Sequence, residues 1–149
     1  MLGIARYSFA VTAACCLVSV GGGRAIGQVP QGEPTGYDAA RGRALFIANC
    51  SACHQANGEG LPGAFPPLKG SGVVNKDDAT KHIHVVLDGM QGARAGGVVY
   101  ANAMPPFAGV LSDADIADII DYERGSWGNH GKPVTAAQVA AERAHSKGT

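Results

Sequence analysis

Two cysteines and a histidine make up the part of the sequence best suited to chemistry. Cys50 and Cys53 stand three residues apart in the run CSACH, and His54 follows the second cysteine directly. Residues three apart on a turn of helix lie on the same side of it, so both sulfurs can engage one group. Three kinds of site use such a pair: a structural zinc site, a reactive dithiol and a covalently attached cofactor.

The residues around the pair separate these alternatives. A structural zinc site needs four ligands, and His82 and His84 stand too close together for the usual spacing of a second ligand pair. A thioredoxin-like dithiol lies where a strand runs into a helix, whereas the preceding segment, YDAARGRALFIANC, indicates a helix with Asp38 as its N-cap. Covalent attachment of haem through C-x-x-C-H also accounts for His54, whose nitrogen can bind the iron. We therefore predict a haem site, with the dithiol as the alternative.

An iron atom held by one histidine has a sixth position, which a side chain from later in the sequence can fill. Met104 stands in YANAMPPFAG, where Pro105 and Pro106 fix the backbone and lack amide donors. This stiff loop can present a thioether to the opposite face of the ring. We expect Met104 to be the sixth ligand, with an imidazole or an open position as the alternative. The other candidates are Met90, His82, His84, His130 and His145.

A helix is predicted within the run KDDATKHIHVVLDG, ending at Gly89. On this register His82 and His84 are expected on the polar side of the helix. Met90, which follows it, is interpreted as an apolar side chain that fills a gap. The buried stripe of the helix is expected to consist of Ala79, Ile83, Val86 and Leu87.

The first 27 residues are predicted to be a signal peptide. Arg6 precedes the apolar run FAVTAACCLVSV, and small residues then lead to a cleavage site near Gly27. A membrane anchor suits the segment less well, because its apolar run is shorter than the roughly 20 residues that cross a bilayer. A lipid anchor at Cys15 or Cys16 lacks the leucine expected three residues earlier. We expect export to the periplasm, with residues 28–36 as a linker.

The composition is that of one ordinary globular domain. The chain has 149 residues, of which 46% are hydrophobic and 16% charged. With 22 glycines and only 6% aromatic residues, it is expected to be rich in loops and short of bulky side chains for a core. Removing Arg6 and Arg24 from 12 basic and 12 acidic side chains leaves a net charge of −2. No basic patch indicates binding to nucleic acid.

Taken together, these motifs resemble those of the class I monohaem cytochromes c, over about residues 37–129. The resemblance rests on CSACH, on FPPLKGS at 65–71, and on YANAMPPF followed by an acidic helix. It implies an all-α cytochrome c fold, with about four to five helices around one covalently bound haem c. The first and last core helices are expected to cross.

The resemblance also implies roles for particular residues. Cys50 and Cys53 would carry the haem, and His54 and Met104 would be its axial ligands. The carbonyl of a proline in FPPL would hold the other imidazole nitrogen, and either Pro66 or Pro67 fits the register. The residues implied to bind the cofactor are Cys50, Cys53, His54, Met104, Pro66 and Leu68, with Leu68 packed against the ring.

The helix crossing has its own residue pattern. Gly42 and Phe46 match the glycine and aromatic pair of the family's first helix, and Ile119 and Tyr122 match their partners on the last. That last helix is predicted from a cap at Ser112 to an end at Gly125, with Asp115 completing a capping box. Its four aspartates, at 113, 115, 118 and 121, are expected to form a solvated acidic face.

The C-terminal segment, residues 130–149, is predicted to be an extension with one short helix. Thr135 and Gln138 form a second capping-box pattern before AAQVAAERA. The run SWGNHGKPVT resembles an extension of cytochrome c domains attached to periplasmic dehydrogenases and oxidases. Trp127 in this run would either cover a haem edge or pin its loop to the body of the domain.

The resemblance implies an electron carrier rather than an enzyme. We expect single electrons to pass from a periplasmic dehydrogenase to an oxidase or reductase, with the chain acting free or as a subunit. These partners would meet a mostly apolar surface, and a membrane would be reached only through a partner complex. The alternative is a haem enzyme or gas-binding sensor with a displaceable sixth ligand.

Overall fold

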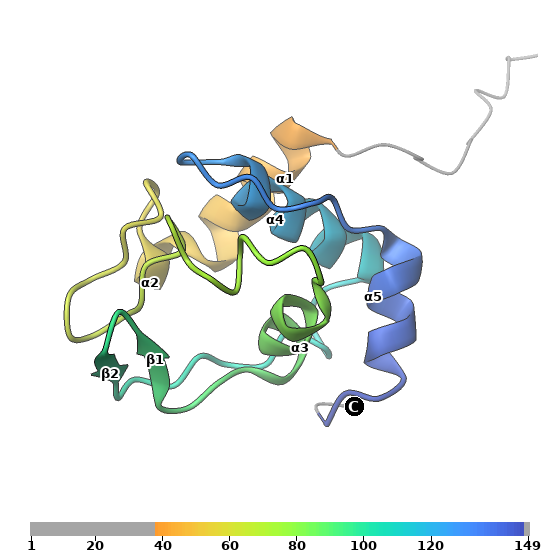
Figure 1. Cartoon of the computed structure of the whole chain (residues 1–149). Coiled ribbons are helices and arrows are strands. Elements are labelled where there is room, and N and C mark those ends of the chain that lie inside the picture. The colour runs from red at the N-terminus through yellow and green to blue at the C-terminus, as the bar shows by residue number, and fades with distance from the viewer. Residues whose placement is uncertain (1–37, 148–149) are drawn as a thin grey trace, which may run out of the picture. The chain divides into compact units, whose positions relative to one another are not determined.

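The computed structural model describes residues 38–147, and the predicted signal peptide (1–27) and linker (28–36) lie outside this range. Within it, five helices and one hairpin are connected by long loops (Figure 1). The helices are α1 (Ala39–Asn49), α2 (Ser51–His54), α3 (Thr80–Asp88), α4 (Asp113–Gly125) and α5 (Ala136–Arg143), and the strands are β1 (Ala93–Ala95) and β2 (Val98–Tyr100). None of the helices in the described range is long and apolar enough to cross a membrane.

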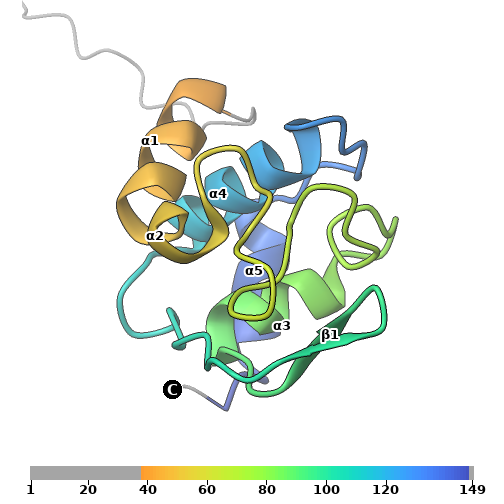
Figure 2. The same cartoon turned by 90° about the vertical axis from the view of Figure 1, so that its left-hand side faces the viewer.

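Helices α1 and α4 cross in close contact, as predicted (Figures 1 and 2). Asp38 caps α1 by accepting hydrogen bonds from two backbone amides of its first turn, each 3.0 Å long. Gly42 stands at the crossing, where a Cβ atom would lie 2.2 Å from the backbone oxygen of Asp118. One turn on, Phe46 is fully buried, and its ring centroid lies 5.3 Å from that of Tyr122. The crossing therefore depends on the missing side chain at position 42.

The aspartates of α4 do not form the solvated face that the sequence suggested. Asp115 and Asp118 both pair with Arg41 of α1, so they brace the helix crossing. Asp113 pairs with Arg143 of α5, with 2.7 Å between Oδ1 and Nε. Asp121 is only 6% exposed and accepts a 2.6 Å hydrogen bond from the backbone N–H of Val134. The acidic face of α4 is therefore held within the folded domain by partners that are distant in the sequence.

Helix α5 closes one side of the core. Its N-terminus has the predicted capping box, in which Thr135 and Gln138 exchange hydrogen bonds. Val139 is fully buried in a cluster shared with α3 and α4. The main members of that cluster are Ile83, Val86, Leu87, Ile116, Ile120, Val134 and Val139. The predicted stripe of α3 is therefore confirmed, and the short C-terminal helix is an integral part of the core.

The hairpin is an addition to the all-helical fold that was predicted. Ala93 pairs with Tyr100 and Ala95 with Val98, in antiparallel register. Gly96 and Gly97 form the two-residue turn, both with positive φ, which is the conformation that such a turn requires. The first strand, ARA, lacks β-branched residues, so strand propensity gave no signal there.

Trp127 and Asn129 attach the segment after α4 to the rest of the domain. Trp127 packs against the rings of Phe46 and Tyr122, and a Cβ atom at Gly58 would lie 2.4 Å from its indole. It pins its loop to the body of the domain and does not line the cavity described below. Asn129 is buried, and its side chain donates to the Leu68 and Glu123 carbonyls and accepts hydrogen bonds from residues 70 and 75.

A substitution at the crossing tests its dependence on Gly42. We expect Gly42→Ala to lower the free energy of unfolding by about 1–3 kcal/mol, because the added methyl group meets the α4 backbone. Alanine otherwise favours helix by about 1 kcal/mol, so a net loss must come from the clash. Gly125→Ala is the matched control, because Gly125 also lies in a helix and a Cβ atom there would meet open space. Equal stabilities of the two variants in denaturant titration would contradict close packing at the crossing.

An ion-pair cluster that joins α3 to α5 makes the stability depend on pH. His84 Nδ1 lies 2.9 Å from Asp88 and its Nε2 lies 2.9 Å from Glu142, and Asp88 also accepts hydrogen bonds from Ser146 and Lys147. Hydrogen bonds to the two carboxylates, that of Asp88 first, raise the pKa of His84 above 6.5. Hydrogen bonds from Ser146 and His84 lower the pKa of Asp88 from 3.8 to about 2.

The two shifts set the edges of a pH window. The raised pKa of His84 contributes stability that is complete below pH 6.5 and is lost as the pH rises through the folded-state value. The lowered pKa of Asp88 contributes stability that is complete above pH 3.8 and is lost as the pH falls toward about 2. We expect His84→Gln to abolish the loss on the alkaline side in urea titrations at a series of pH values. An unchanged alkaline limb in this variant would refute the assignment.

Candidate cofactor site

A large cavity lies between the α1–α2 junction, α3, α4 and the loop that carries Met104. The empty space within it, counting the open mouth, is about 930 Å³. Most of its lining is apolar, and the sequence-predicted residues Cys50, His54, Pro66, Leu68 and Met104 all face it. Other apolar side chains of the lining include Val74, Val86, Phe107, Leu111 and Ile119.

The CSACH run begins where α1 ends. The Cys50 N–H donates to the Phe46 carbonyl of α1, and the Cys50 carbonyl accepts from the amides of Cys53 and His54 at 3.2 and 3.0 Å. This junction links the position of the run to the helix crossing. Burial, with further contributions from Glu123 and Cys53, raises the pKa of the Cys50 thiol far above its usual value. The wall therefore favours an uncharged sulfur at this point.

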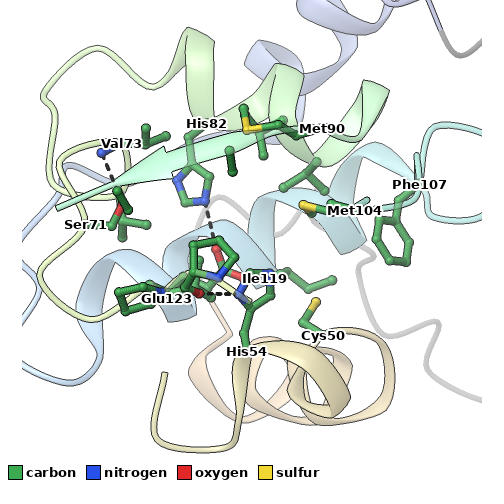
Figure 3. Close-up of a pocket in the computed structure, with 18 of the residues that line it drawn as sticks. Cys50, His54, Ser71, Val73, His82, Met90, Met104, Phe107, Ile119 and Glu123 are labelled. Carbon is green, nitrogen blue, oxygen red and sulfur yellow. Dashed lines mark hydrogen bonds and ion pairs between the residues drawn. The ribbon is translucent and has the colours of Figure 1, made fainter. Parts of the chain in front are cut away.

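His54 is held by the loop that follows it. His54 is only 8% exposed, and Nδ1 of its ring lies 3.0 Å from the carbonyl oxygen of Pro66 (Figure 3). The carbonyl that faces the imidazole is therefore that of Pro66 rather than Pro67. Because this hydrogen bond uses Nδ1, Nε2 is the nitrogen left to bind a metal, and the bond raises its basicity.

Met104 reaches the cavity from the other side. In Figure 3, Cys50 and His54 come from the α1–α2 junction, whereas Met104 and Met90 come from the opposite wall. Met90 and Met104 are joined by two backbone hydrogen bonds of 3.1 and 2.8 Å, so the Met104 loop is tied to the end of α3. At Gly89 a Cβ atom would lie 2.4 Å from the Met104 carbonyl oxygen, so this joint also requires a glycine.

His82 was predicted on the polar side of its helix, and this prediction was wrong. The side chain is 3% exposed and lines the cavity, with Nε2 2.8 Å from Oε2 of Glu123 on α4 (Figure 3). Periodicity along α3 could not reveal the carboxylate that stabilises it, because Glu123 comes from a helix 41 residues away. His84 is half-buried and bound to Asp88 and Glu142, as described above.

A second hollow, called here the basic hollow, adjoins the cavity. It lies between the hairpin and the loop after Pro67, and it was not foreseen because its basic residues are scattered along the sequence. Its basic lining residues are Lys69, Lys76, Lys81 and Arg94, of which Lys69 pairs with Glu59. Arg94 also lines the main cavity, so positive charge lies near one part of its wall.

Comparison with known proteins shows the family to which the chain belongs. The family model for cytochrome c matches residues 39–127, and the chain belongs to the cytochrome c family. The chain is 36% identical, over 118 residues, to the gluconate 2-dehydrogenase cytochrome c subunit of Pantoea cypripedii, covering 78% of this chain and 27% of that subunit. The all-α fold predicted from the sequence is therefore confirmed, with the hairpin as an addition.

Other relatives include proteins of very different length. The chain is 34% identical to the cytochrome c subunit of the quinone alcohol dehydrogenase of Gluconobacter oxydans, covering 73% of this chain and 26% of that subunit. It is 38% identical to cytochrome c-552 of Thermus thermophilus, covering 68% of this chain and 83% of that protein. The chain thus spans about a quarter of the length of the dehydrogenase subunits it matches.

The residues of the cavity fit the cofactor of this family. Cytochromes c carry covalently bound haem, so the cofactor is one haem c attached through two thioethers. The cavity offers an apolar wall, Cys50 at a point where an uncharged sulfur is favoured, and nitrogen and thioether donors on opposing sides. Cys53, three residues after Cys50, does not itself line the cavity. Within the described residues, no group of three or more His, Cys, Asp or Glu side chains is placed to hold a bare metal ion, so the structure offers no set of ligands for the zinc alternative.

The contact between His54 and Pro66 depends on a glycine that can be tested. A Cβ atom at Gly60 would lie 2.7 Å from the Pro66 carbonyl oxygen, whereas Gly63 has open space around it. Both glycines have positive φ, so alanine at either position carries the same backbone penalty of about 1 kcal/mol. We expect Gly60→Ala to cost about 1–3 kcal/mol of unfolding free energy beyond Gly63→Ala. Equal losses in denaturant titration would show that the Pro66 segment is free to move.

Proposed function

We propose that the chain is a periplasmic monohaem electron carrier that passes single electrons from a dehydrogenase to a terminal oxidase or reductase. The observation that carries this proposal is the placing of His54 and Met104 on opposing sides of one apolar cavity. With haem bound, these two side chains would hold the iron from both sides and would leave no position where a substrate could bind it. Membership of the cytochrome c family supports electron transfer in general.

Each site residue then has a distinct role. Cys50 and Cys53 would form the thioethers, and His54 Nε2 and the Met104 sulfur would hold the iron. Pro66 orients the imidazole through its 3.0 Å hydrogen bond, and Leu68 packs against the ring. The bound cofactor supplies a one-electron couple, which a thioether ligand shifts toward the reduced form relative to two imidazoles.

The chain's own contribution is to hold both donors in place. The Pro66 hydrogen bond fixes the imidazole, and the Met90 bridge with Pro105 and Pro106 fixes the thioether. Apolar side chains around the cavity limit access of water. Since few atoms need to move when the charge changes, the site favours rapid exchange of electrons over chemistry on a bound substrate.

The proposed location and partners are supported by the relatives, the predicted leader and the surface. The relatives are named as cytochrome subunits of gluconate, alcohol and fructose dehydrogenases, which supports a dehydrogenase as donor. The predicted leader supports export. The hairpin, which contributes Arg94 and Ala95 to the cavity wall, exposes Val98 and Val99 at 44% and 49%. Such an edge suits the small, weak interfaces that redox encounters use.

Replacement of Met104 tests the proposal directly. We expect Met104→Ala holoprotein to remain folded but to lose the weak near-infrared band of iron bound to methionine sulfur, and to bind carbon monoxide when reduced. Met90→Ala is the matched control, because Met90 lines the same cavity and pairs with Met104 through backbone atoms only. It should keep the band and exclude carbon monoxide. The measurements are optical spectra of oxidised and reduced protein.

Two outcomes would count against this function. If the wild-type protein lacked the sulfur band and bound carbon monoxide, the sixth position would be open and a gas sensor or haem enzyme would fit better. If Met90→Ala, rather than Met104→Ala, lost the band, the axial ligand would have been assigned to the wrong methionine.

A further inference from the structure

The last residue of α5 binds a turn that belongs to the wall of the cofactor cavity. The Arg143 guanidinium donates hydrogen bonds to the Ala108 and Leu111 carbonyls, the second of them 2.9 Å long. Its Nε donates to Oδ1 of Asp113 at 2.7 Å. The side chain of Arg143 is only 20% exposed, so these bonds form largely away from solvent. One planar cation therefore joins three points of the chain that lie 30 or more residues before it.

The turn, residues 107–111, follows directly on the loop that carries Met104. Within it, the Phe107 carbonyl accepts hydrogen bonds from two later amides of the turn, both 3.0 Å long. Pro105 and Pro106 lie between Met104 and the turn, and two consecutive prolines allow little adjustment of the backbone. A displacement of the turn is therefore passed on to Met104.

On its other side, the same turn is bound to the end of α3. Its first two amides donate to the Val86 and Leu87 carbonyls at 3.0 and 3.2 Å. Phe107, labelled in Figure 3, and Leu111 line the cavity. The turn thus lies between two attachments, the backbone of α3 on one side and the Arg143 guanidinium on the other.

Arg143 reaches the turn because α5 is docked on the core next to it. Val139, one helical turn earlier on the same face, is fully buried in the cluster shared with α3 and α4. Glu142, the residue before Arg143, lies 2.9 Å from Nε2 of His84 on α3. The family model matches residues 39–127, so the match assigns no role to this helix.

We propose that Arg143 is a positioning residue for the sixth iron ligand. Its bonds to the turn at 107–111 hold the Met104 thioether in place and oppose its displacement by ligands from solution. Through Arg143, the C-terminal helix determines how firmly the sixth position is closed. This inference rests on the proposed function, since it requires Met104 to be the axial ligand.

The size of the effect follows from competition for one coordination position. A ligand from solution binds only those molecules in which the Met104 loop has opened. Its apparent dissociation constant is therefore its intrinsic constant divided by the open fraction. Opening the loop separates the turn from Arg143 and breaks hydrogen bonds from a charged donor, which are stronger than those between neutral groups. Removing these bonds in advance should raise the open fraction about tenfold.

The test is a titration of the oxidised holoprotein with imidazole, followed through loss of the near-infrared band of iron bound to methionine sulfur. Arg143→Gln should bind imidazole about tenfold more tightly than the wild-type protein. Asp113→Asn is the matched control, because it removes the charge of the ion-pair partner and leaves both carbonyl bonds of Arg143 in place. Its affinity should stay within about twofold of the wild-type value. An equal gain in Asp113→Asn would attribute the effect to the ion pair and overturn the inference.

A second background separates the positioning of Met104 from a general loosening of the cavity. In Met104→Ala holoprotein no thioether competes with imidazole for the sixth position. Adding Arg143→Gln to this variant should therefore change the imidazole affinity by less than about twofold, as measured from visible spectra. A tenfold gain here as well would mean that Arg143 shapes the cavity without holding Met104, which would overturn the inference.

Arg143→Lys covers a failure of Arg143→Gln to fold. Lysine keeps the charge but lacks the planar fork, so it cannot bind two carbonyls and Asp113 together. We expect it to bind imidazole about threefold more tightly than the wild-type protein. Wild-type affinity in Arg143→Gln, or in Arg143→Lys where the first variant does not fold, would refute the role of Arg143 alone. A wild-type protein without the sulfur band would instead count against the proposed function.

Discussion

The crossing of α1 over α4 is the constraint on which the rest of the site depends. Gly42 allows the α4 backbone to come within reach of α1, and Phe46 and Tyr122 fill the space beside it. The same helix α1 ends at the cysteine run, and the same helix α4 presents Ile119 and Glu123 to the cavity. A shift at the crossing would therefore move the attachment point of the cofactor relative to its opposite wall.

Local patterns in the sequence predicted much of this architecture. The capping residues Asp38, Ser112 and Thr135, the buried stripe of α3 and the Gly42–Phe46 pair all depend on neighbours a few positions apart along the chain. The caps and the buried stripe can be read from spacing alone, whereas the role of the Gly42–Phe46 pair was predicted from the resemblance to the cytochrome c family. For the site, the short-range signal was equally clear at CSACH, and the prolines after Met104 indicated a stiff loop.

Apart from the hairpin, the features that sequence reasoning missed are long-range pairings between polar groups. His82 and Asp121 are buried because Glu123 and the Val134 amide receive them, and neither partner is adjacent on the same helix turn. A polar residue on a helix is assigned to solvent unless its partner is known. The basic hollow escaped notice for the same reason, since folding gathers its residues from separate segments.

Because of Asn129, the segment needed for a stable domain extends beyond the segment that matches the cytochrome c family. The cytochrome c match ends at residue 127, yet the amide of Asn129 joins the end of α4 to the loop at residues 68–75 that forms part of the cavity wall. A fragment that ended at residue 127 would keep every cofactor-binding residue but would lose the Asn129 hydrogen bonds that hold this loop. In any fusion or minimal version of the protein, the working unit thus extends through the SWGN turn and into the segment that docks Val139.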